Sequence, residues 1–312
     1  MTLEARVLLF GGSAAAELAP CVADRLGWRL GSCSVRRFPD GEVNVRLEES
    51  VRGREVFFLQ PTSPPVNDNL MELLAFTDAC RRSAASRVTA IAPYFGYARA
   101  DRRGGRRDPI AASLVASMIE AAGVDYLVSV DLHSPAIEGF FRIPVDSLSA
   151  LPVLADALKP RMTRETVVVS PDLGRLEAAS ELGRRLGLSV AAVHKKRLSG
   201  TEVQTLAVIG DVRDRSCVIL DDMISTGGTI AAATEALAGA GAHADWIVAA
   251  THGVFAPGAA AMLGAAGVQA VLVTDTIPPA PDWPAVERVS IAPLLAEALR
   301  RIVADESLRD LV

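Results

Sequence analysis

The chain has 312 residues, of which half are apolar and 5% aromatic, and its formal net charge is −5. This length allows two domains with a core each, and the negative charge argues against a general nucleic-acid-binding protein. No apolar run reaches the roughly 20 residues of a membrane span, and four widely spaced cysteines without metal-type spacing indicate reduced, buried thiols. The first residues lack a signal-peptide layout, so we expect a cytoplasmic protein with no membrane partner.

Short apolar runs alternate with amphipathic or alanine-rich stretches along almost the whole chain. The predicted strands are residues 7–10, 43–47, 56–60, 88–93, 126–131, 167–170, 190–193, 217–221, 246–251 and 270–275. The predicted helices are residues 14–26, 68–83, 110–122, 151–158, 175–186, 229–240, 257–266 and 293–304. This alternation predicts an α/β fold with mostly parallel sheets covered by helices. A complete set of such units lies on either side of residue 149, so we expect two domains, 1–148 and 149–312.

The first polar cluster is the turn Phe38-Pro39-Asp40-Gly41-Glu42. A plain hairpin explains it, because Pro and Gly favour turns. An exposed aromatic ring beside two acids can also stack on a purine and accept hydrogen bonds from it. The residues alone leave both interpretations open.

Arg99 follows a predicted strand and begins a basic run that includes Arg102, Arg103, Arg106 and Arg107. A solvated basic loop would have this composition. Arginine forks also bind phosphate oxygens in pairs, and ligands of α/β sheets bind at the carboxyl ends of strands. The position therefore favours nucleotide phosphates.

His133 and Asp172 stand at the ends of two further predicted strands. A single His is usually a packing or surface residue, but beside an acid at a strand end it becomes a candidate ligand for a metal or a phosphate oxygen. The carboxylate of Asp172 suits Mg²⁺, which prefers oxygen ligands.

The segment from His194 to Val203 is basic and is predicted to be a loop, with Lys195, Lys196 and Arg197 in succession. Such a basic run usually lies on the solvent-exposed surface. In a protein with sites for two phosphate-bearing ligands, its cations can instead neutralise charge on a transferring phosphoryl group.

The densest cluster runs from Asp221 to Thr229, where a strand, a Gly-Gly turn and a helix start follow one another. Helix capping by an ordinary turn is the simpler alternative. Two acids, three hydroxyls and two glycines in nine residues favour a sugar-phosphate site, with the phosphate at the helix N-terminus. The stretch resembles the ribose-phosphate loop of the phosphoribosyltransferase fold, although Ser225 stands where many relatives have a third acid.

Together the clusters resemble the ribose-phosphate diphosphokinase (phosphoribosyl-pyrophosphate synthetase) family, in the same order and over nearly the whole chain. Further matching motifs are Asn67-Asp68-Asn69-Leu70-Met71-Glu72-Leu73, Pro93-Tyr94-Phe95-Gly96-Tyr97, Gly139-Phe140-Phe141, Thr251-His252-Gly253 and Pro293-Leu294-Leu295-Ala296-Glu297. The resemblance implies two phosphoribosyltransferase-like domains and an enzyme. Its reaction would move the diphosphoryl group of MgATP to the 1-hydroxyl of ribose 5-phosphate, giving 5-phosphoribosyl 1-diphosphate and AMP.

The resemblance also implies roles for particular residues, with ATP on the side of residues 1–148 and ribose 5-phosphate on the side of residues 149–312. The catalytic pair would be Lys195 and Arg197, and the metal-binding residues for Mg²⁺ would be His133 and Asp172. The ATP-binding residues would be Phe38, Asp40, Gly41, Glu42, Arg99, Ala100 and Asp101. Ribose 5-phosphate would contact Arg197, Asp221, Asp222, Ser225, Thr226, Gly227, Gly228 and Thr229. The family further implies a homo-oligomer built from dimers, up to a hexamer, with an ATP site shared between subunits.

Several positions depart from the family pattern. Ala100 replaces a common Gln, Leu173-Gly174-Arg175 replaces a more glycine-rich turn, and the residues around Gly105 and Arg106 lack the pattern linked to phosphate activation and ADP inhibition. We therefore expect little activation by phosphate. The rival interpretations are a regulatory homologue without catalysis, which typically loses the loop of Lys195 and Arg197, and a phosphoribosyltransferase that consumes the diphosphate. The second rival leaves the clusters around Phe38 and Arg99 without a role.

Overall fold

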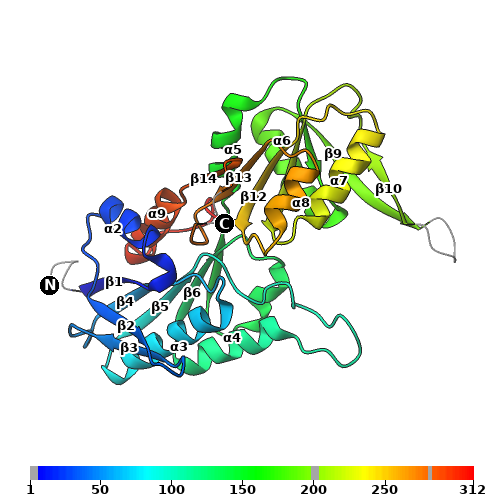
Figure 1. The fold of residues 1–312 in the computed structure, drawn as a ribbon. Coiled ribbons are helices and arrows are strands. Elements are labelled where there is room, and N and C mark those ends of the chain that lie inside the picture. Colours follow the sequence, from blue (N-terminus) through cyan, green and yellow to red (C-terminus); the bar gives the residue numbers. More distant parts are fainter. Residues whose placement is uncertain (1–5, 198–203, 280–282) are drawn as a thin grey trace. The chain divides into compact units, whose positions relative to one another are not determined.

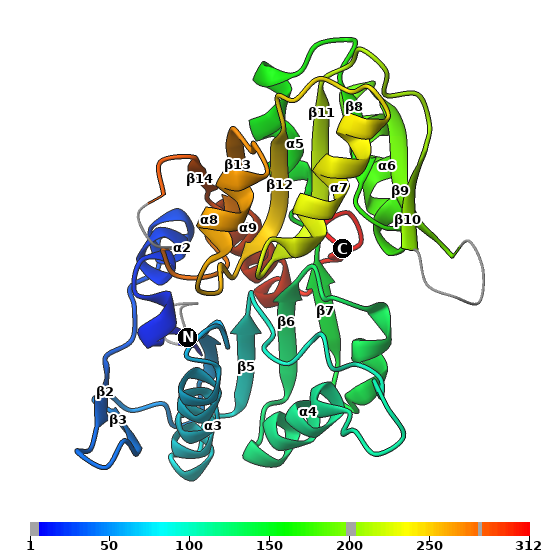
Figure 2. The ribbon, with the colours of Figure 1, turned by 45° about the vertical axis from the view of Figure 1, so that its right-hand side comes forward.

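The computed structural model describes residues 6–197, 204–279 and 283–312 (Figure 1). The chain divides into two compact units. Unit 1 contains residues up to 149 together with 276–278 and 290–312, and unit 2 contains residues 150–275 and 279–289. Each unit holds a mainly parallel sheet flanked by helices, so the predicted α/β class is confirmed (Figure 2).

The sheet of unit 1 has five parallel strands in the order β1-β4-β5-β6-β7. The strands are β1 (Val7–Gly11), β4 (Glu55–Leu59), β5 (Arg87–Ala92), β6 (Tyr126–Val130) and β7 (Val145–Leu148). The first four are buried along almost their whole length, because helices cover both faces and leave no position for a solvated side chain.

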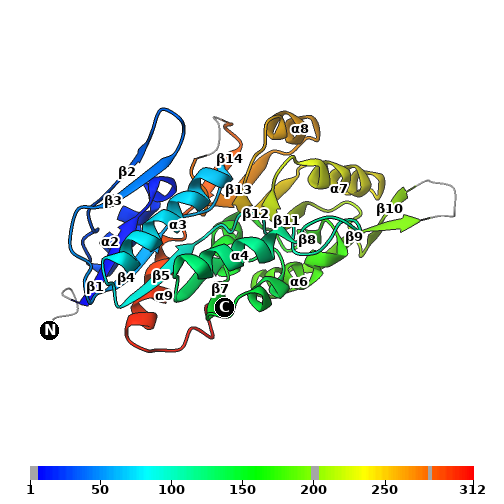
Figure 3. The ribbon, with the colours of Figure 1, turned by 90° about the horizontal axis from the view of Figure 1, so that it is seen from below.

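One face of this sheet is covered by α3 (Val66–Arg82) and α4 (Ala111–Ala122) (Figure 3). Leu73 and Phe76 of α3 and Ile119 of α4 are fully buried in the same core as Phe58, whose ring stacks on Phe76 at 3.7 Å. Toward the other face, α2 (Leu18–Leu26) packs against α9 (Ala292–Val303), and Trp28 contacts the ring of Phe57.

The C-terminal segment differs from the predicted domain range, because residues 290–312 group with unit 1 although the second domain was expected to run to 312. The apolar side of α9, with Leu295 and Leu299 fully buried, is the reason, since α9 packs against α2. Ser149 donates its backbone N–H to the carbonyl oxygen of Leu311 at 2.7 Å, which places the last residues beside the end of β7.

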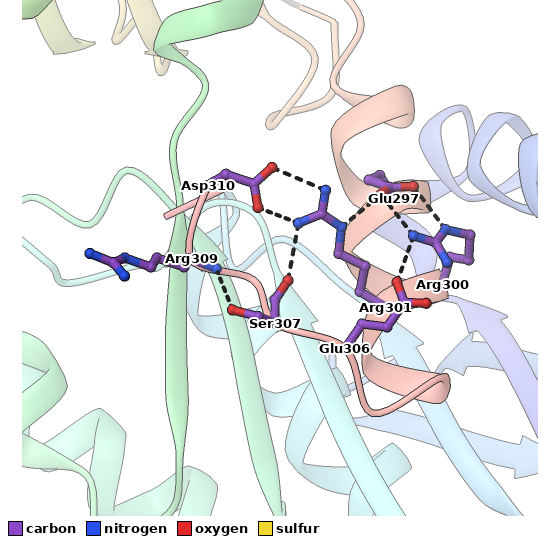
Figure 4. Close-up of polar contacts among 7 residues, drawn as sticks. All are labelled: Glu297, Arg300, Arg301, Glu306, Ser307, Arg309 and Asp310. Carbon is purple, nitrogen blue, oxygen red and sulfur yellow. Dashed lines mark hydrogen bonds and ion pairs between the residues drawn. The ribbon is translucent and has the colours of Figure 1, made fainter.

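Arg301 joins α9 to the last residues of the chain (Figure 4). Its guanidinium contacts both carboxylate oxygens of Asp310 and donates to the carbonyl oxygen of Ser307 at 3.0 Å. It also donates to Glu297 at 2.7 Å, and Arg300 bridges Glu297 and Glu306. Hydrogen bonds from the two arginines lower the pKa of Glu297 to about 2.

Arg301→Ala is expected to release residues 305–312 from α9, because it removes every one of these contacts of Arg301 at once. Amide hydrogen exchange in the tail should speed up about tenfold or more, while exchange in β5 stays unchanged. Arg309→Ala is the matched control, since Arg309 points away from the cluster in Figure 4. Because the pKa of Glu297 is depressed, the stability that this residue contributes is present above pH 4.5, the ordinary pKa of a Glu, and is lost as the pH falls toward 2. Equal tail exchange in the two variants would refute this role.

Within the described residues, the sheet of unit 2 has seven strands in the order β10-β9-β8-β11-β12-β13-β14, and only β10 runs antiparallel to its neighbour. The strands are β8 (Val167–Ser170), β9 (Ser189–Arg197), β10 (Gln204–Ile209), β11 (Cys217–Ile224), β12 (Ile247–Gly253), β13 (Ala270–Thr274) and β14 (Val286–Val289). One core joins the sheet to α5 (Leu151–Leu158) and α6 (Leu176–Leu186), and another joins it to α7 (Gly228–Gly239) and α8 (Ala259–Ala265). The central strand β11 contributes Val218 and Leu220 to the first core and Ile219 to the second, so helices cover both faces.

Some elements differ from the prediction. Residues 194–197 were expected in a loop, but their backbone continues β9 and pairs with β10. Strands β2 (Cys33–Arg37), β7 and β14 were not predicted, because their half-exposed patterns lack the continuous apolar run of a central strand. Strand β10, which pairs with β9 at the edge of its sheet, was not predicted either. In the part of the chain that the structure covers, no helix combines the length and apolarity needed to cross a membrane.

The four thiols differ in exposure, and this predicts their reactivity. Burial raises the pKa of Cys33 to about 11 and those of Cys80 and Cys217 to about 12, whereas Cys21 is exposed on α2. The thiolate is the nucleophile, so we expect iodoacetamide at pH 8 to modify Cys21 first in the native protein and all four after denaturation. Peptide mass spectrometry checks this, and equally fast modification of Cys80 would contradict it.

Candidate functional site

Four predicted residues of unit 1 lie together at the tip of a hairpin formed by β2 and β3 (Val43–Leu47), which pair antiparallel. The N–H of Phe38 donates to the carbonyl oxygen of Glu42 at 2.9 Å, and the N–H of Gly41 donates to that of Phe38 at 2.9 Å. Asp40 accepts the N–H of Glu42 at 3.1 Å. Gly41 has φ +94°, a conformation that favours glycine. The turn leaves the ring of Phe38 50% exposed, outside the core of unit 1.

The segment after β5 carries Arg99, Ala100 and Asp101. Thr62 holds this segment, because its hydroxyl accepts the N–H of Gly96 at 2.6 Å and its own N–H donates to the carbonyl oxygen of Tyr94 at 2.9 Å. Arg99 is exposed, and Ala100 and Asp101 are half-buried. The following arginines of the basic run are exposed as well. The structure thus presents an exposed guanidinium on a fixed backbone at the carboxyl end of a parallel strand.

His133 lies at the carboxyl end of β6, which is the neighbour of β5 in the sheet. Leu132 donates its N–H to the hydroxyl of Ser147 at 3.1 Å, and Asp131 donates its N–H to the carbonyl oxygen of Leu148 at 2.9 Å. Asp131 has φ +41° and Tyr97, after β5, has φ +65°. Backbone strain of this kind occurs often at functional sites, and here it follows two adjacent strands.

Asp172 occupies the corresponding position after β8 in unit 2. Its side chain is exposed and accepts the N–H of Gly174 at 2.8 Å, and thereby caps a short 3-10 helix, Leu173–Arg175. The hydroxyl of Ser170 donates to the carbonyl oxygen of Asp172 at 2.5 Å and fixes the turn from the other side. An exposed carboxylate on a fixed turn is a suitable oxygen ligand for Mg²⁺.

Asp221 and Asp222 lie near the carboxyl end of β11, the strand next to β8. Asp222 is buried and its carboxylate pairs with the guanidinium of Arg175 at 2.5 Å. Asp221 is half-buried and accepts the N–H of Asp222 at 2.8 Å. Burial and the neighbouring Asp222 carboxyl raise the pKa of Asp221 well above its usual range, and the charge of Arg175 acts in the opposite direction. A negative charge on Asp221 is therefore unfavourable unless a cation is close.

Residues 225–227 connect β11 to α7, whose first two residues are Gly228 and Thr229. Gly227 stands at the helix N-cap with φ +84°, and a Cβ there would come within 3.0 Å of Leu263. The N-cap residue Gly227 has no side chain, and the hydroxyl of Thr226 accepts the N–H of Gly228, the first residue of this 12-residue helix, at 3.5 Å. Thr226 and Thr229 are exposed, and Ser225 and Gly228 are half-buried. Backbone N–H groups and hydroxyls at a helix start are the donors that a phosphate group needs.

The side chains of Lys195 and Arg197 lie outside the described part of the structure. Their backbone belongs to β9, where Lys195 is the register partner of Leu206 and Arg197 that of Gln204. Both residues thus stand near the end of the antiparallel pair at the edge of the unit 2 sheet.

Each unit therefore gathers part of the predicted site at the carboxyl edge of its own sheet. Unit 1 has Arg99 and His133 after adjacent strands, and unit 2 has Asp172 and the Asp221–Thr229 loop after adjacent strands. In the described residues, no three His, Cys, Asp or Glu side chains gather into a metal-binding group. Sequence reasoning did not single out Arg175, which the structure pairs with Asp222; its signal in the sequence was a cation where the family pattern has a glycine-rich turn.

Two family models match the chain. The model for the N-terminal domain of ribose phosphate pyrophosphokinase matches residues 7–123, and the model for the phosphoribosyl synthetase-associated domain matches residues 197–312. Both matches cover segments that carry predicted site residues.

Full-length relatives were also found. The ribose-phosphate pyrophosphokinase of Campylobacter jejuni is 43% identical over 97% of this chain and 98% of its own length, and that of Vibrio cholerae is 46% identical over 96% and 97%. A crystal structure of phosphoribosylpyrophosphate synthetase from Mycobacterium smegmatis superposes with a TM-score of 0.88 at 41% identity, covering 96% of this chain and 99% of that chain. The similarity therefore extends over both units.

Proposed function

The chain belongs to the ribose-phosphate pyrophosphokinase family, and from this we infer that it is a transferase acting on ATP and ribose 5-phosphate. The oxygen of the sugar 1-hydroxyl attacks the β-phosphorus of ATP. The bond between that phosphorus and the oxygen that bridges to the α-phosphorus breaks, so AMP leaves and 5-phosphoribosyl 1-diphosphate forms. The product supplies a precursor for nucleotide biosynthesis.

The observation that carries this proposal is the similarity over nearly the full length of enzymes named for it, 43–46% identical to this chain. Phosphoryl transfer needs little covalent help from a protein, because positioning of the reactants and neutralisation of charge account for most of the catalysis. Lys195 and Arg197 are the proposed catalytic pair, which stabilises the negative charge that builds up on the transferring group.

The proposed ATP site uses the hairpin tip and the segment after β5. Phe38 stacks on the adenine ring, and Asp40, Gly41 and Glu42 supply hydrogen-bond partners for its edge. Arg99 binds the triphosphate, with Ala100 and Asp101 beside it. The half-exposed ring of Phe38, which does not serve the core of unit 1, supports this assignment and is consistent with a hairpin that reaches a second subunit of a homo-oligomer built from dimers.

The proposed site for ribose 5-phosphate is the Asp221–Thr229 loop. The start of α7 and the hydroxyls of Ser225, Thr226 and Thr229 bind the 5-phosphate. Asp221 and Asp222 lie where carboxylates can accept hydrogen bonds from the sugar hydroxyls. With the catalytic pair, these residues would make residues 149–312 the sugar side of the enzyme and residues 1–148 the ATP side.

The proposed cofactor is Mg²⁺, for which Asp172 in unit 2 and His133 in unit 1 are the proposed ligands. Asp172 fits this role, because its carboxylate is exposed on a fixed turn. Mg²⁺ in such enzymes is commonly held by one or two protein groups together with substrate phosphates, which agrees with a described chain that offers single ligands and no cluster of three. When bound, the ion supplies positive charge to the triphosphate.

Product analysis tests the proposed function. The purified protein, mixed with Mg²⁺, ATP and ribose 5-phosphate, should release AMP and the sugar diphosphate in equal amounts. ADP in place of AMP would show that a single phosphoryl group is transferred. Binding of ribose 5-phosphate without turnover would favour a regulatory homologue, and no response to either substrate would reject the proposal.

A further inference from the structure

Arg175 and Asp222 form an ion pair at the edge of the proposed ribose 5-phosphate site, residues 221–229. The guanidinium and the carboxylate are 2.5 Å apart, and their side chains are only 21% and 7% exposed. Arg175 ends the short turn after β8, and Asp222 lies near the end of β11, the next strand of the sheet. Strand order therefore brings together two residues that are far apart in the sequence.

The Arg175–Asp222 pair is less exposed than the ion pairs on the following helix, α6. On α6, Arg184 and Arg185 both pair with Glu181, but the side chain of Arg184 is 71% exposed. Exposed pairs contribute little to stability, because water screens them and the long side chains lose freedom. A buried pair has a large desolvation cost, and removing one partner leaves an uncompensated charge. An arginine half-buried against a buried carboxylate is hence a poor choice for stability alone.

The Arg175–Asp222 pair also affects Asp221, the acid next to Asp222 in the sequence. Asp221 accepts the backbone N–H of Asp222 at 2.8 Å, so the side chain of one acid depends on the placement of the other. Burial of the Asp221 carboxyl favours its neutral form, whereas the charge of Arg175 favours its ionised form. The turn that ends with Arg175 begins at Asp172, so the ion pair also ties the turn after β8 to the end of β11.

We propose that Arg175 is a positioning residue for the sugar: it anchors Asp222 and thereby holds Asp221 in place to accept hydrogen bonds from the ribose hydroxyls. Arg175 need not touch the substrate in this role. The inference rests on the proposed function, because it assigns Arg175 to the ribose 5-phosphate site of that reaction. It makes this arginine part of sugar recognition and not of ATP binding.

The test is the kinetics of Arg175→Gln, in which the side chain keeps most of its length and loses its charge. We expect the KM for ribose 5-phosphate to rise about tenfold or more, with kcat and the KM for ATP within about threefold of the wild type. Arg175→Lys keeps the charge without the planar fork and should recover part of the loss. Arg184→Gln on α6, the helix that follows Arg175, is the matched control, with unchanged kinetics.

A double-mutant cycle shows whether Arg175 acts through Asp222. If it does, Arg175→Gln in an Asp222→Asn background should raise the sugar KM by less than about twofold. A sugar KM of Arg175→Gln within about twofold of the wild type, or fully additive effects in the cycle, would overturn the inference. If Arg175→Gln does not fold, the Arg175→Lys variant decides. A wild-type KM for ribose 5-phosphate in that variant would count against a role for the planar guanidinium of Arg175.

The wild-type protein in the same assay separates this inference from the proposed function. AMP release by the wild type together with a normal sugar KM for Arg175→Gln rejects the inference alone. Without AMP release by the wild type, the proposed function fails. Calorimetric titration with ribose 5-phosphate then decides, because weaker binding by Arg175→Gln supports the inference and equal binding rejects it.

Discussion

Replacing Lys195 by alanine is expected to lower kcat by about 10²- to 10³-fold, the loss typical when one preorganised charge-stabilising group is removed. The reason is that the transferring diphosphoryl group gathers negative charge, and a cation that meets it in the transition state lowers the barrier. The KM values for both substrates should change much less than kcat. Steady-state measurement of AMP release at saturating ATP and ribose 5-phosphate checks this.

Lys196→Ala is the matched control for that prediction. It removes the same charge from the same strand, β9, at the next residue, so it separates a specific role from a general loss of positive potential. Thermal melts of both variants should coincide with that of the wild type. Near-normal turnover of Lys195→Ala, or an equal loss in Lys196→Ala, would remove Lys195 from the proposed catalytic pair.

Asp221→Asn is expected to raise the KM for ribose 5-phosphate by about 10- to 100-fold, which corresponds to roughly 1.4–2.8 kcal/mol of binding free energy. The carboxylate accepts hydrogen bonds from sugar hydroxyls, and an amide has one acceptor oxygen fewer and presents a donor instead. The variant should also melt no lower than the wild type, because burial and Asp222 disfavour the charge of Asp221 in the folded protein.

Asp156→Asn serves as the control for this second prediction. Asp156 is an exposed acid on α5 of the same unit, so its replacement changes net charge equally without touching the loop. Titration calorimetry with ribose 5-phosphate provides a check that does not depend on turnover. An unchanged sugar KM for Asp221→Asn would argue against this residue as a sugar ligand.

Central strands and the helices between them could be predicted because their signals are local. Strands such as β4 and β6 are buried at every position, and only continuous apolar runs can occupy them. The sequences of edge strands indicate their secondary structure less clearly. Strand β14 has Glu287 and Arg288 exposed in its middle, and its pairing with β13 becomes visible only once that neighbour is in place.

The predicted site could be reached from the sequence because polar clusters at strand ends stand out against apolar strands. Phe38, Arg99, Asp172 and the Asp221–Thr229 loop all interrupt or follow such runs, and the structure places each of them at a turn or at the carboxyl edge of a sheet. Their roles toward substrates remain predictions, and the experiments above test them.

The sequence by itself determined the α/β class, the order of its central elements and the chemical types of the site residues, since periodicity and composition act over a few neighbouring residues. The tertiary structure alone decided that α9 packs with α2 in unit 1 and that Arg175 meets the buried carboxylate of Asp222. Such contacts join segments far apart in the chain. They depend on strand order and on which helix face finds an apolar partner, and these are properties of the whole fold that no short stretch of sequence contains.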